Sequence, residues 1–336
     1  YYTKDYEKGL QLYSNGVLIM DKCADLLPDH FSFVRGMVDT ADLSLNISRE
    51  MLQHDRHLKA IAQSLEKKIK SELLKLQKDK REDYETFWKA FGRQIKYGAY
   101  VQYGAHKELL QDLLMYYSST EDKLTSLEEY VSRMKEEQKY IYYACGETVD
   151  KIKLLPAMET LRDKGYEVLC LDDNIDEFCI KMLANYKEKE FKSIADADLG
   201  LDTEDDKEEI KKLSEENAAL LTALGEALTG KVKKVELTSR LKSHPCCLRA
   251  EGPVTLEMEK VLNQQALDDS QRIHAERVLE LNASHPIFQK LCALQQEGSD
   301  KIKTYADILY TQALLIEGLP VDDPVAYANA VCDLIS

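Results

Sequence analysis

Hydrophobic residues recur at two different periods along this chain, and the changes of period divide it into segments. The clearest helical pattern lies at residues 48–80, where apolar residues spaced three or four apart form one stripe and the opposite face is charged. This segment predicts one long helix or two joined helices. The stripe consists of Leu58, Ile61, Leu65, Ile69, Leu73 and Leu76.

Shorter patterns flank the long helix. Ser126 and Glu129 have the spacing of a capping box, which predicts a short helix after Ser126. The other predicted elements are a strand at 10–20 that Asn15-Gly16 interrupts, a helix at 26–38, a loop at 39–46, and helices at 84–95 and 107–117.

The middle of the chain changes to short apolar runs of strand length. Strands are predicted at 139–145, 166–171 and 191–194, with helices at 148–164 and 175–186 between them. Gly165 stands where a helix C-cap glycine belongs. Strand and helix in alternation predict a small α/β unit with parallel pairing.

An acidic stretch follows, and a mixed segment completes the chain. Eight carboxylates between Asp196 and Glu209 indicate a linker. Beyond it we predict helices at 207–228, 255–267, 286–296 and 302–317, a last helix capped by Asp323 with Pro324 at its first position, and strands at 232–241, 246–250 and 277–281.

These elements predict a mixed α/β (α+β) fold in which two α/β units are joined by a helical segment and followed by a mixed C-terminal domain with a helical end. The predicted divisions are the rest of a large α/β unit with a helical segment at 1–125, a small α/β unit at 126–198, an acidic linker at 199–206 and a C-terminal domain at 207–336.

Charge and cysteine content narrow the class of protein. The formal net charge of −15 disfavours binding to nucleic acids or to anionic membranes. No apolar run approaches the roughly 20 residues that span a bilayer. The eight cysteines form no C-x-x-C pair, which is typical of reduced thiols in a cytoplasmic protein.

Motifs of self-contained enzymes are missing from the sequence. It has no phosphate-binding G-x-x-x-x-G-K-[ST] or G-x-G-x-x-G loop, no G-x-S-x-G elbow and no H-E-x-x-H pair. His54 and His57 share a helix face but lack further ligands, and the acidic stretch lacks EF-hand spacing, so no metal site is predicted. A small α/β enzyme centred on residues 139–194 is therefore a weak alternative.

Several segments resemble the heat shock protein 90 chaperone family in its bacterial form. The longest match is VRGMVDTADLSLNISREMLQ at residues 34–53. Further matches follow in the family's order: YVSRMKEEQKYIYY at 130–143, IDEF at 175–178, LTSRLKSHPCCL at 237–248 and LYTQALLIEGLPVDDP at 309–324. The resemblance implies the middle and C-terminal parts of such a chaperone, which folds client proteins in an ATP-dependent stress response.

The resemblance gives Arg49 and Gln53 a role in ATP hydrolysis. An arginine in the first turn of a helix is suited to meet a phosphate, although Arg49 is also placed to pair with Glu50 or Asp55. In the family the matching residues reach the γ-phosphate of ATP, which an N-terminal domain holds with Mg²⁺. We therefore expect this chain alone to bind no nucleotide and not to hydrolyse ATP. It carries Asn15-Gly16 where many relatives have an arginine pair.

The resemblance also implies contacts with unfolded clients. The predicted helix at 255–267 carries an apolar face that is either an ordinary core stripe or an adaptable surface, for which methionine is suited. The client-contact residues implied are Phe178, Val254, Met258, Val261 and Leu262.

The last two predicted helices carry many apolar residues for the end of a small domain. In the family such helices pair with a second copy about a twofold axis, so we expect a homodimer. The predicted interface residues are Tyr305, Ile308, Leu309, Leu315, Val331, Leu334 and Ile335. An acidic EEVD-type tail does not follow Ile335 and Ser336, so no tail-docked co-chaperone is expected. The alternative from another class is a dimeric scaffold without a nucleotide cycle.

Overall fold

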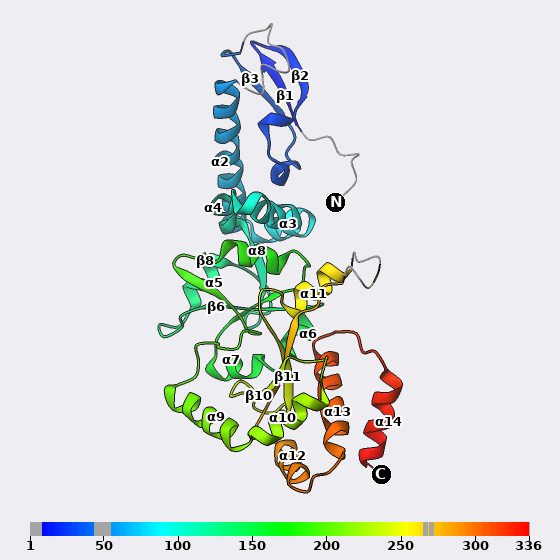
Figure 1. The fold of residues 1–336 in the computed structure, drawn as a ribbon. Coiled ribbons are helices and arrows are strands. Elements are labelled where there is room, and N and C mark those ends of the chain that lie inside the picture. Colours follow the sequence, from blue (N-terminus) through cyan, green and yellow to red (C-terminus); the bar gives the residue numbers. More distant parts are fainter. Residues whose placement is uncertain (1–8, 44–54, 265–267, 269–271, 336) are drawn as a thin grey trace. The chain divides into compact units, whose positions relative to one another are not determined.

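The computed structural model describes residues 9–43, 55–264, 268 and 272–335, and the contacts within it divide these residues into two units. Unit 1 consists of residues up to Tyr116 together with Leu124–Ser132 and Phe178–Tyr186. Unit 2 consists of Tyr117–Lys123, Arg133–Glu177 and the residues from Lys187 onward. Both units combine helices with sheets, which confirms the predicted mixed α/β class (Figure 1).

Unit 1 begins with a three-stranded sheet in the order β2-β1-β3. Its strands are β1 (Leu10–Ser14), β2 (Val17–Cys23) and β3 (Met37–Thr40); β1 pairs antiparallel with β2 and parallel with β3. The interruption predicted at Asn15-Gly16 is a hairpin turn. Both residues adopt left-handed backbone angles, with φ of 50° and 77°, as a two-residue hairpin turn requires.

The helix predicted at 26–38 is wrong. Two 3-10 turns, η1 (Ala24–Leu26) and η2 (Asp29–Phe31), stand there instead, followed by β3. The physical reason is Pro28, which has no N–H to donate and forces the residue before it out of the helical region. Leu27 is accordingly extended, with φ −136° and ψ 130°.

The long helix is confirmed as α2 (Arg56–Asp79), which Asp55 caps with hydrogen bonds from the N–H groups of His57 and Leu58. Residues 48–54 of the predicted helix lie outside the described residues. All six positions of the predicted apolar stripe are buried or half-buried. Helix α3 (Arg81–Gly104) runs beyond the predicted 84–95, and its backbone leaves the helical region at Val101–Tyr103.

The helix predicted at 107–117 is only half correct. It ends early as α4 (Lys107–Leu110) and the 3-10 turn η3 (Gln111–Leu113), after which β4 (Met115–Ser118) begins. The run MYYS pairs in a sheet because aromatic residues pack well on a pleated surface. Near the turn, the Tyr84 hydroxyl donates to the Leu113 carbonyl at 2.6 Å.

The central sheet has six strands in the order β5-β4-β7-β6-β9-β8. Strand β6 pairs in parallel with both β7 and β9, which confirms the predicted parallel unit. Around these strands lie three short helices and a longer one. The bounds are β5 (Leu124–Ser126), α5 (Leu127–Arg133), β6 (Ile141–Cys145), α6 (Val149–Lys153), α7 (Met158–Lys164), β7 (Val168–Leu171), α8 (Asp176–Leu183), β8 (Asn185–Tyr186) and β9 (Lys189–Ser193).

Two of the helix-end signals predicted in this region are confirmed, and one predicted helix is wrong. The capping box is confirmed, since the N–H of Glu129 donates to the Ser126 hydroxyl and the N–H of Ser126 to the Glu129 carboxylate. Gly165 ends α7 with left-handed angles, as predicted. The single helix predicted at 148–164 is wrong, because Pro156 divides it into α6 and α7.

The C-terminal part of unit 2 is a second sheet covered by helices. Its strands are β10 (Lys234–Leu237), β11 (Cys246–Glu251) and β12 (Glu276–Leu281), in the order β10-β12-β11, with β10 parallel and β11 antiparallel to β12. The helices are α9 (Glu204–Glu216), α10 (Ala218–Ala227), α11 (Leu256–Asn263), α12 (Pro286–Gln296), α13 (Lys301–Ile316) and α14 (Pro324–Ile335).

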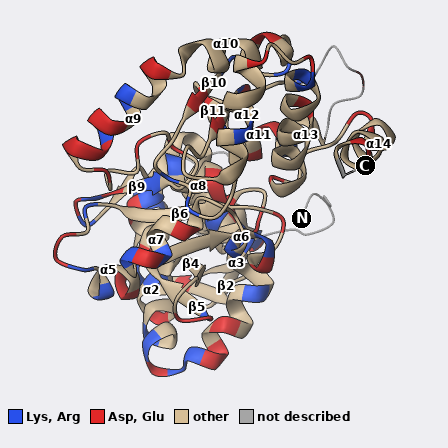
Figure 2. Cartoon of the chain, turned by 90° about the horizontal axis from the view of Figure 1, so that it is seen from below, with Lys and Arg blue, Asp and Glu red and all other residues tan. Residues whose placement is uncertain are grey.

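The acidic stretch and the predicted helix at 207–228 differ from their predictions. Thr203 and Asp206 form a capping box that starts α9 inside the acidic stretch. The helix then breaks at Asn217, giving α9 and α10. Helix α9 buries no residue and presents acidic and basic side chains to solvent, whereas α10 buries Leu220 and Leu224 (Figure 2). The change from charged to apolar face explains the break.

Candidate functional site

Helix α11 carries the predicted client-contact face, and two buried side chains anchor it. Leu256 belongs to the apolar core of the C-terminal sheet. The buried Glu259 accepts hydrogen bonds from the Arg277 guanidinium at 2.6 Å and from the N–H of Ala275 at 3.0 Å. Thr255 caps the helix by accepting from the N–H of Met258. These contacts fix the orientation of the helix against β12.

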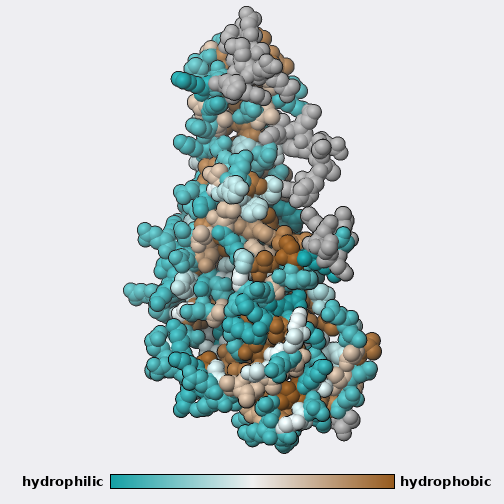
Figure 3. Space-filling view, viewed as in Figure 1, coloured by the Kyte–Doolittle hydropathy of each residue, from teal (hydrophilic) through white to brown (hydrophobic). Residues whose placement is uncertain are grey.

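The predicted face itself is not part of the fully buried core. Val254, Met258 and Val261 are half-buried, and 41% of Leu262 is exposed. Apolar surface lies at the place of α11 in the space-filling view (Figure 3). The helix therefore buries Leu256 and Glu259 on one side while it leaves Met258 and Leu262, one turn apart, partly open to solvent. A simple core stripe would be fully buried.

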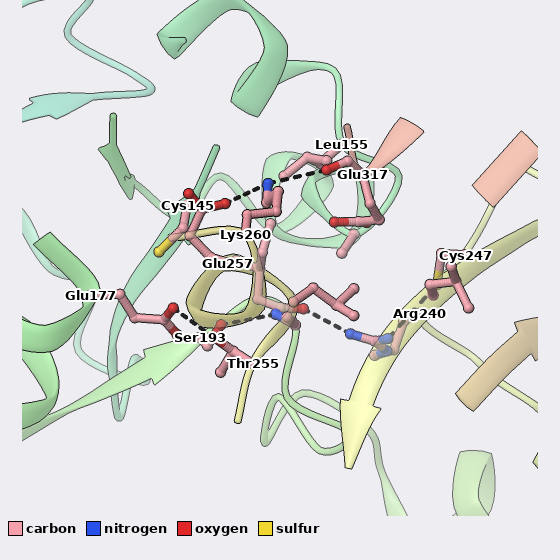
Figure 4. A pocket seen from close by; sticks show the side chains of 15 residues that line it. Cys145, Leu155, Glu177, Ser193, Arg240, Cys247, Thr255, Glu257, Lys260 and Glu317 are labelled. Atoms are coloured by element: carbon pink, nitrogen blue, oxygen red, sulfur yellow. Dashed lines mark hydrogen bonds and ion pairs between the residues drawn. The ribbon is translucent and has the colours of Figure 1, made fainter. Parts of the chain in front are cut away.

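A small cavity of about 50 Å³ lies beside the start of α11, within unit 2 (Figure 4). The Thr255 hydroxyl donates to the Glu177 carboxylate at 2.6 Å, and Lys260 donates to the main-chain carbonyl of Glu317 at 3.1 Å. The cavity is large enough for water but not for a cofactor. Its lining residues include Cys145, Ser193, Arg240, Cys247, Glu257 and Leu155.

Three titratable groups of this cavity have shifted pKa values. Burial raises the pKa of the Glu317 carboxyl to about 7, although the nearby charges of Lys260 and Arg240 oppose the shift. Burial also raises the pKa of the Cys145 and Cys247 thiols well above their usual range. Both sulfurs therefore stay protonated at neutral pH and do not supply the thiolate that nucleophilic catalysis requires.

A buried charge network extends from the cavity into the C-terminal sheet. The Arg240 guanidinium pairs with the Glu280 carboxylate, which also accepts from Arg249 at 2.9 Å. Arg240 further donates to the main-chain carbonyls of Ile194 at 2.7 Å and Asp196 at 3.1 Å. One side chain thus joins the end of β9 to the C-terminal sheet.

The segment after Arg240 adds a second polar connection. The Glu159 carboxylate at the start of α7 accepts from the N–H groups of Lys242 and Ser243 and from the Ser243 hydroxyl. Burial alone raises the pKa of Glu159, but the hydrogen bonds from Ser243 and Lys242 and the charge of His244 lower it to about 2. The two halves of unit 2 therefore meet through satisfied polar groups.

Sequence reasoning missed this network, although a signal was present. Glu280 stands between Leu279 and Leu281 in a strand whose other positions from Val278 onward are apolar. A carboxylate in such a run requires a buried cationic partner, and Arg240 in the segment LTSRLKSHPCCL supplies it. The partner's position 40 residues earlier was not predictable from the pattern.

The other predicted catalytic and client-contact residues fall in two places. Phe178 lies in unit 1, where its half-buried ring meets the Tyr100 ring edge-on at 5.9 Å. Arg49 and Gln53 lie outside the described residues, so their role stays a prediction. Phe178 and α11 belong to different units.

The predicted dimer-interface residues have different environments. On α13, Leu309 and Ile308 are buried, and Tyr305 packs against the core. Leu315 is 53% exposed. Val331 and Leu334 on α14 are half-buried, and the side chain of Ile335 lies outside the described residues. The dimer interface stays a prediction. Of its predicted residues on α13, Ile308 and Leu309 are buried within the chain, whereas Leu315 is exposed.

The described residues show neither a metal site nor a membrane-spanning helix. No group of three or more histidine, cysteine or acidic side chains among them is arranged to hold a metal ion. None of the helices described has both the length and the apolar character needed to cross a bilayer.

Comparison with known proteins identifies the family. The profile of the Hsp90 protein family matches residues 1–336, and the chain therefore belongs to that family. Its relatives include the chaperone protein HtpG of Oceanobacillus iheyensis, 59% identical over 335 residues, and that of Bacillus subtilis, 58% identical over the same length. HtpG of Clostridium acetobutylicum is also 58% identical. Each alignment covers 100% of this chain and 53% of the relative, so the chain spans about half their length.

Proposed function

We propose that this chain is the client-binding and dimerising part of an ATP-dependent molecular chaperone of the cytoplasm. The carrying observation is α11, which is anchored by Leu256 and Glu259 and leaves Met258 and Leu262 partly open. A rigid helix with a flexible methionine face suits partners of varied sequence. The chaperone names of the relatives support the same function.

Suppression of aggregation tests this proposal. The 336-residue chain should slow the aggregation of a thermally unfolded protein, and Met258→Glu with Leu262→Glu should remove most of that effect. Leu154→Glu is the matched control, because Leu154 is also apolar and is 75% exposed, but lies after α6. Equal loss in the control, or no loss in the α11 variant, would contradict the role of α11.

The nucleotide cycle is the second part of the proposal. Arg49 and Gln53 would contact the γ-phosphate of ATP that an N-terminal domain of the full-length protein holds with Mg²⁺, and charge developing there would be stabilised from outside the nucleotide pocket. In the full-length protein, Arg49→Ala should lower the rate of ATP hydrolysis by about 10³-fold with little change in nucleotide affinity. If the Arg49→Ala variant hydrolysed ATP as fast as the parent, the proposed role of Arg49 would be wrong.

Dimerisation through α13 and α14 is the third part. Helix α14 is rich in apolar residues, but none of its described side chains is buried, and Val325 is 68% exposed. Burial of this face against a second copy about a twofold axis would remove it from water. The expected partners of the full-length protein are therefore a second copy and unfolded clients.

Light scattering tests the interface. The measured mass of the intact chain should be twice the 38.5 kDa of a single chain. A chain that ends after Asp322 should be monomeric. This truncation removes only α14, whereas one after Ser299 also removes the core residues Leu309 and Ala313 and tests folding as well. Val325→Asp is the corresponding point variant. A monomeric intact chain at micromolar concentration would overturn dimerisation and leave the client-binding proposal standing.

A further inference from the structure

A row of aromatic rings lies where α3 meets α8 in unit 1. The ring centroids of Tyr97 and Tyr100, three residues apart on α3, are 6.5 Å apart, and Tyr100 lies 5.9 Å from Phe178 of α8. Tyr97 is exposed, and Tyr100 and Phe178 are half-buried. Phe178 therefore belongs to a larger aromatic surface and is not an isolated ring.

Tyr103 follows Tyr100 by three residues, beyond a kink near the end of α3, and the backbone holds it in an unusual conformation. Gln102 and Tyr103 both have left-handed angles, with φ of 53° and 55°. This conformation is unfavourable for residues other than glycine. The Tyr103 side chain nevertheless gains no burial within the chain, because 96% of it is exposed.

Contacts with α8 fix the strained segment in place. Gly104 has a φ of +73°, and a Cβ atom on it would lie 2.8 Å from the Met182 side chain, so both the backbone and α8 favour glycine there. The Lys107 ammonium donates to the Met182 carbonyl at 3.2 Å. The structure therefore keeps Tyr103 pointing into solvent at a conformational cost. Retained strain of this kind is typical of residues that contact a ligand.

The charge of this surface is opposite to that of the chain. Residues 86–107 contain no aspartate or glutamate, whereas the whole chain has a net charge of −15. Lys89 and Arg93 are exposed and Lys107 is half-buried, but Lys96 is buried and does not contribute to the surface. Lys181 is exposed on α8, three residues after Phe178 and thus on the same side of that helix. A basic surface attracts acidic partners and disfavours pairing with the same surface of a second copy.

We propose that Tyr97, Tyr100, Tyr103 and Phe178, together with Lys181, form a surface that selects extended, acidic segments of unfolded clients. The inference rests on the proposed chaperone function and adds the chemistry of the preferred client. The rings provide rigid apolar area at low entropic cost, and the cations attract aspartate and glutamate between the client's apolar residues.

Binding of two labelled peptides to the 336-residue chain tests this inference. The peptides share length and apolar positions; one carries aspartate and glutamate between them, and the other lysine and arginine. Fluorescence anisotropy should show about tenfold tighter binding of the acidic peptide, with the preference falling as salt rises. Tyr103→Asn should weaken acidic binding about tenfold, because asparagine retains the left-handed backbone without the ring. Lys181→Glu should abolish the preference.

Two controls separate this surface from general effects. Leu154→Ala removes an exposed apolar side chain elsewhere, and Lys211→Glu reverses a charge on the exposed helix α9; both should bind like the parent. Equal affinity for the two peptides, or unchanged acidic binding in Tyr103→Asn, would overturn the inference. If Met258→Glu still weakened binding in that case, the proposed chaperone function would stand. If neither peptide bound and no variant changed aggregation, both would fail.

Discussion

The Arg240 guanidinium and the Glu280 carboxylate form an ion pair from which water is almost excluded, since only 4% and 2% of their side chains are exposed. The pair has further partners, because Glu280 also accepts from Arg249 and Arg240 donates to two main-chain carbonyls. Such a network is stable only when every member is satisfied.

Arg240→Ala should therefore destabilise the protein strongly. It leaves Glu280 buried with fewer partners and the carbonyl of Ile194 without its donor, at a cost of about 3–5 kcal/mol in the free energy of unfolding. Urea denaturation measures this change. Lys212→Ala serves as the control, because its pairing with Glu216 is solvent-exposed and should contribute less than about 1 kcal/mol. Equal effects of the two substitutions would contradict the importance of burial.

Glu159→Gln should lower stability more at neutral pH than in acid. The folded state depresses the pKa of Glu159 from 4.5 to about 2, so its stabilisation is present above pH 4.5 and is lost as the pH falls towards 2. We expect the free energy of unfolding to fall by about 1.5–3 kcal/mol at pH 7, since the acceptor of the weakened hydrogen bonds is a charged carboxylate. Urea denaturation at pH 7 and pH 3 measures it, with Glu215→Gln on α9 as a neutral comparison. A loss that is as large at pH 3 would exclude the charge as its source.

Glu317→Gln should show the opposite pH dependence. Its folded-state pKa of about 7 lies above the ordinary 4.5, so the folded protein binds this proton more tightly than the unfolded one. Between these values the free energy of unfolding falls as the pH rises, because the carboxyl must ionise while it is partly removed from water. The variant, which is always neutral, should melt at a higher temperature than the parent at pH 8 and at the same temperature below the unfolded-state pKa of 4.5. Equal melting temperatures at pH 8 would contradict the assignment.

Two glycine-to-alanine substitutions should change stability in opposite directions. A Cβ on Gly98 would lie 2.4 Å from the Cβ of the buried His30, so Gly98→Ala should cost about 1–3 kcal/mol through overpacking. Gly225 lies within α10 with nothing near its Cβ position, so Gly225→Ala should stabilise by up to about 1 kcal/mol. Thermal unfolding of the pair measures both. A stabilising Gly98→Ala would mean that η2 moves freely away from α3.

Prediction from sequence succeeded where a local physical cause decides the structure. Helix α12 has its predicted bounds because Pro286 starts it, and Asp323 caps α14 by accepting from the N–H of Ala326. The helices predicted at 26–38 and 148–164 are wrong because the prediction followed the apolar spacing. In the structure, Pro28 and Pro156 interrupt both segments. The resemblance identified the family. Neither the resemblance nor the periodicity predicted the ion pair between Arg240 and Glu280, since this contact depends on tertiary structure.

The long sequence separations of the Arg240 network have a consequence for biosynthesis. A ribosome releases the chain from its N-terminal end, so the carbonyls of Ile194 and Asp196 and the guanidinium of Arg240 emerge well before Glu280, 40 residues later. Until β12 is made, Arg240 has no carboxylate to be buried with, and the C-terminal sheet lacks its central strand. The parallel α/β unit is complete in sequence at that moment. Synthesis thus delivers the β6–β9 unit first and closes its connection to the C-terminal half only once β12 arrives.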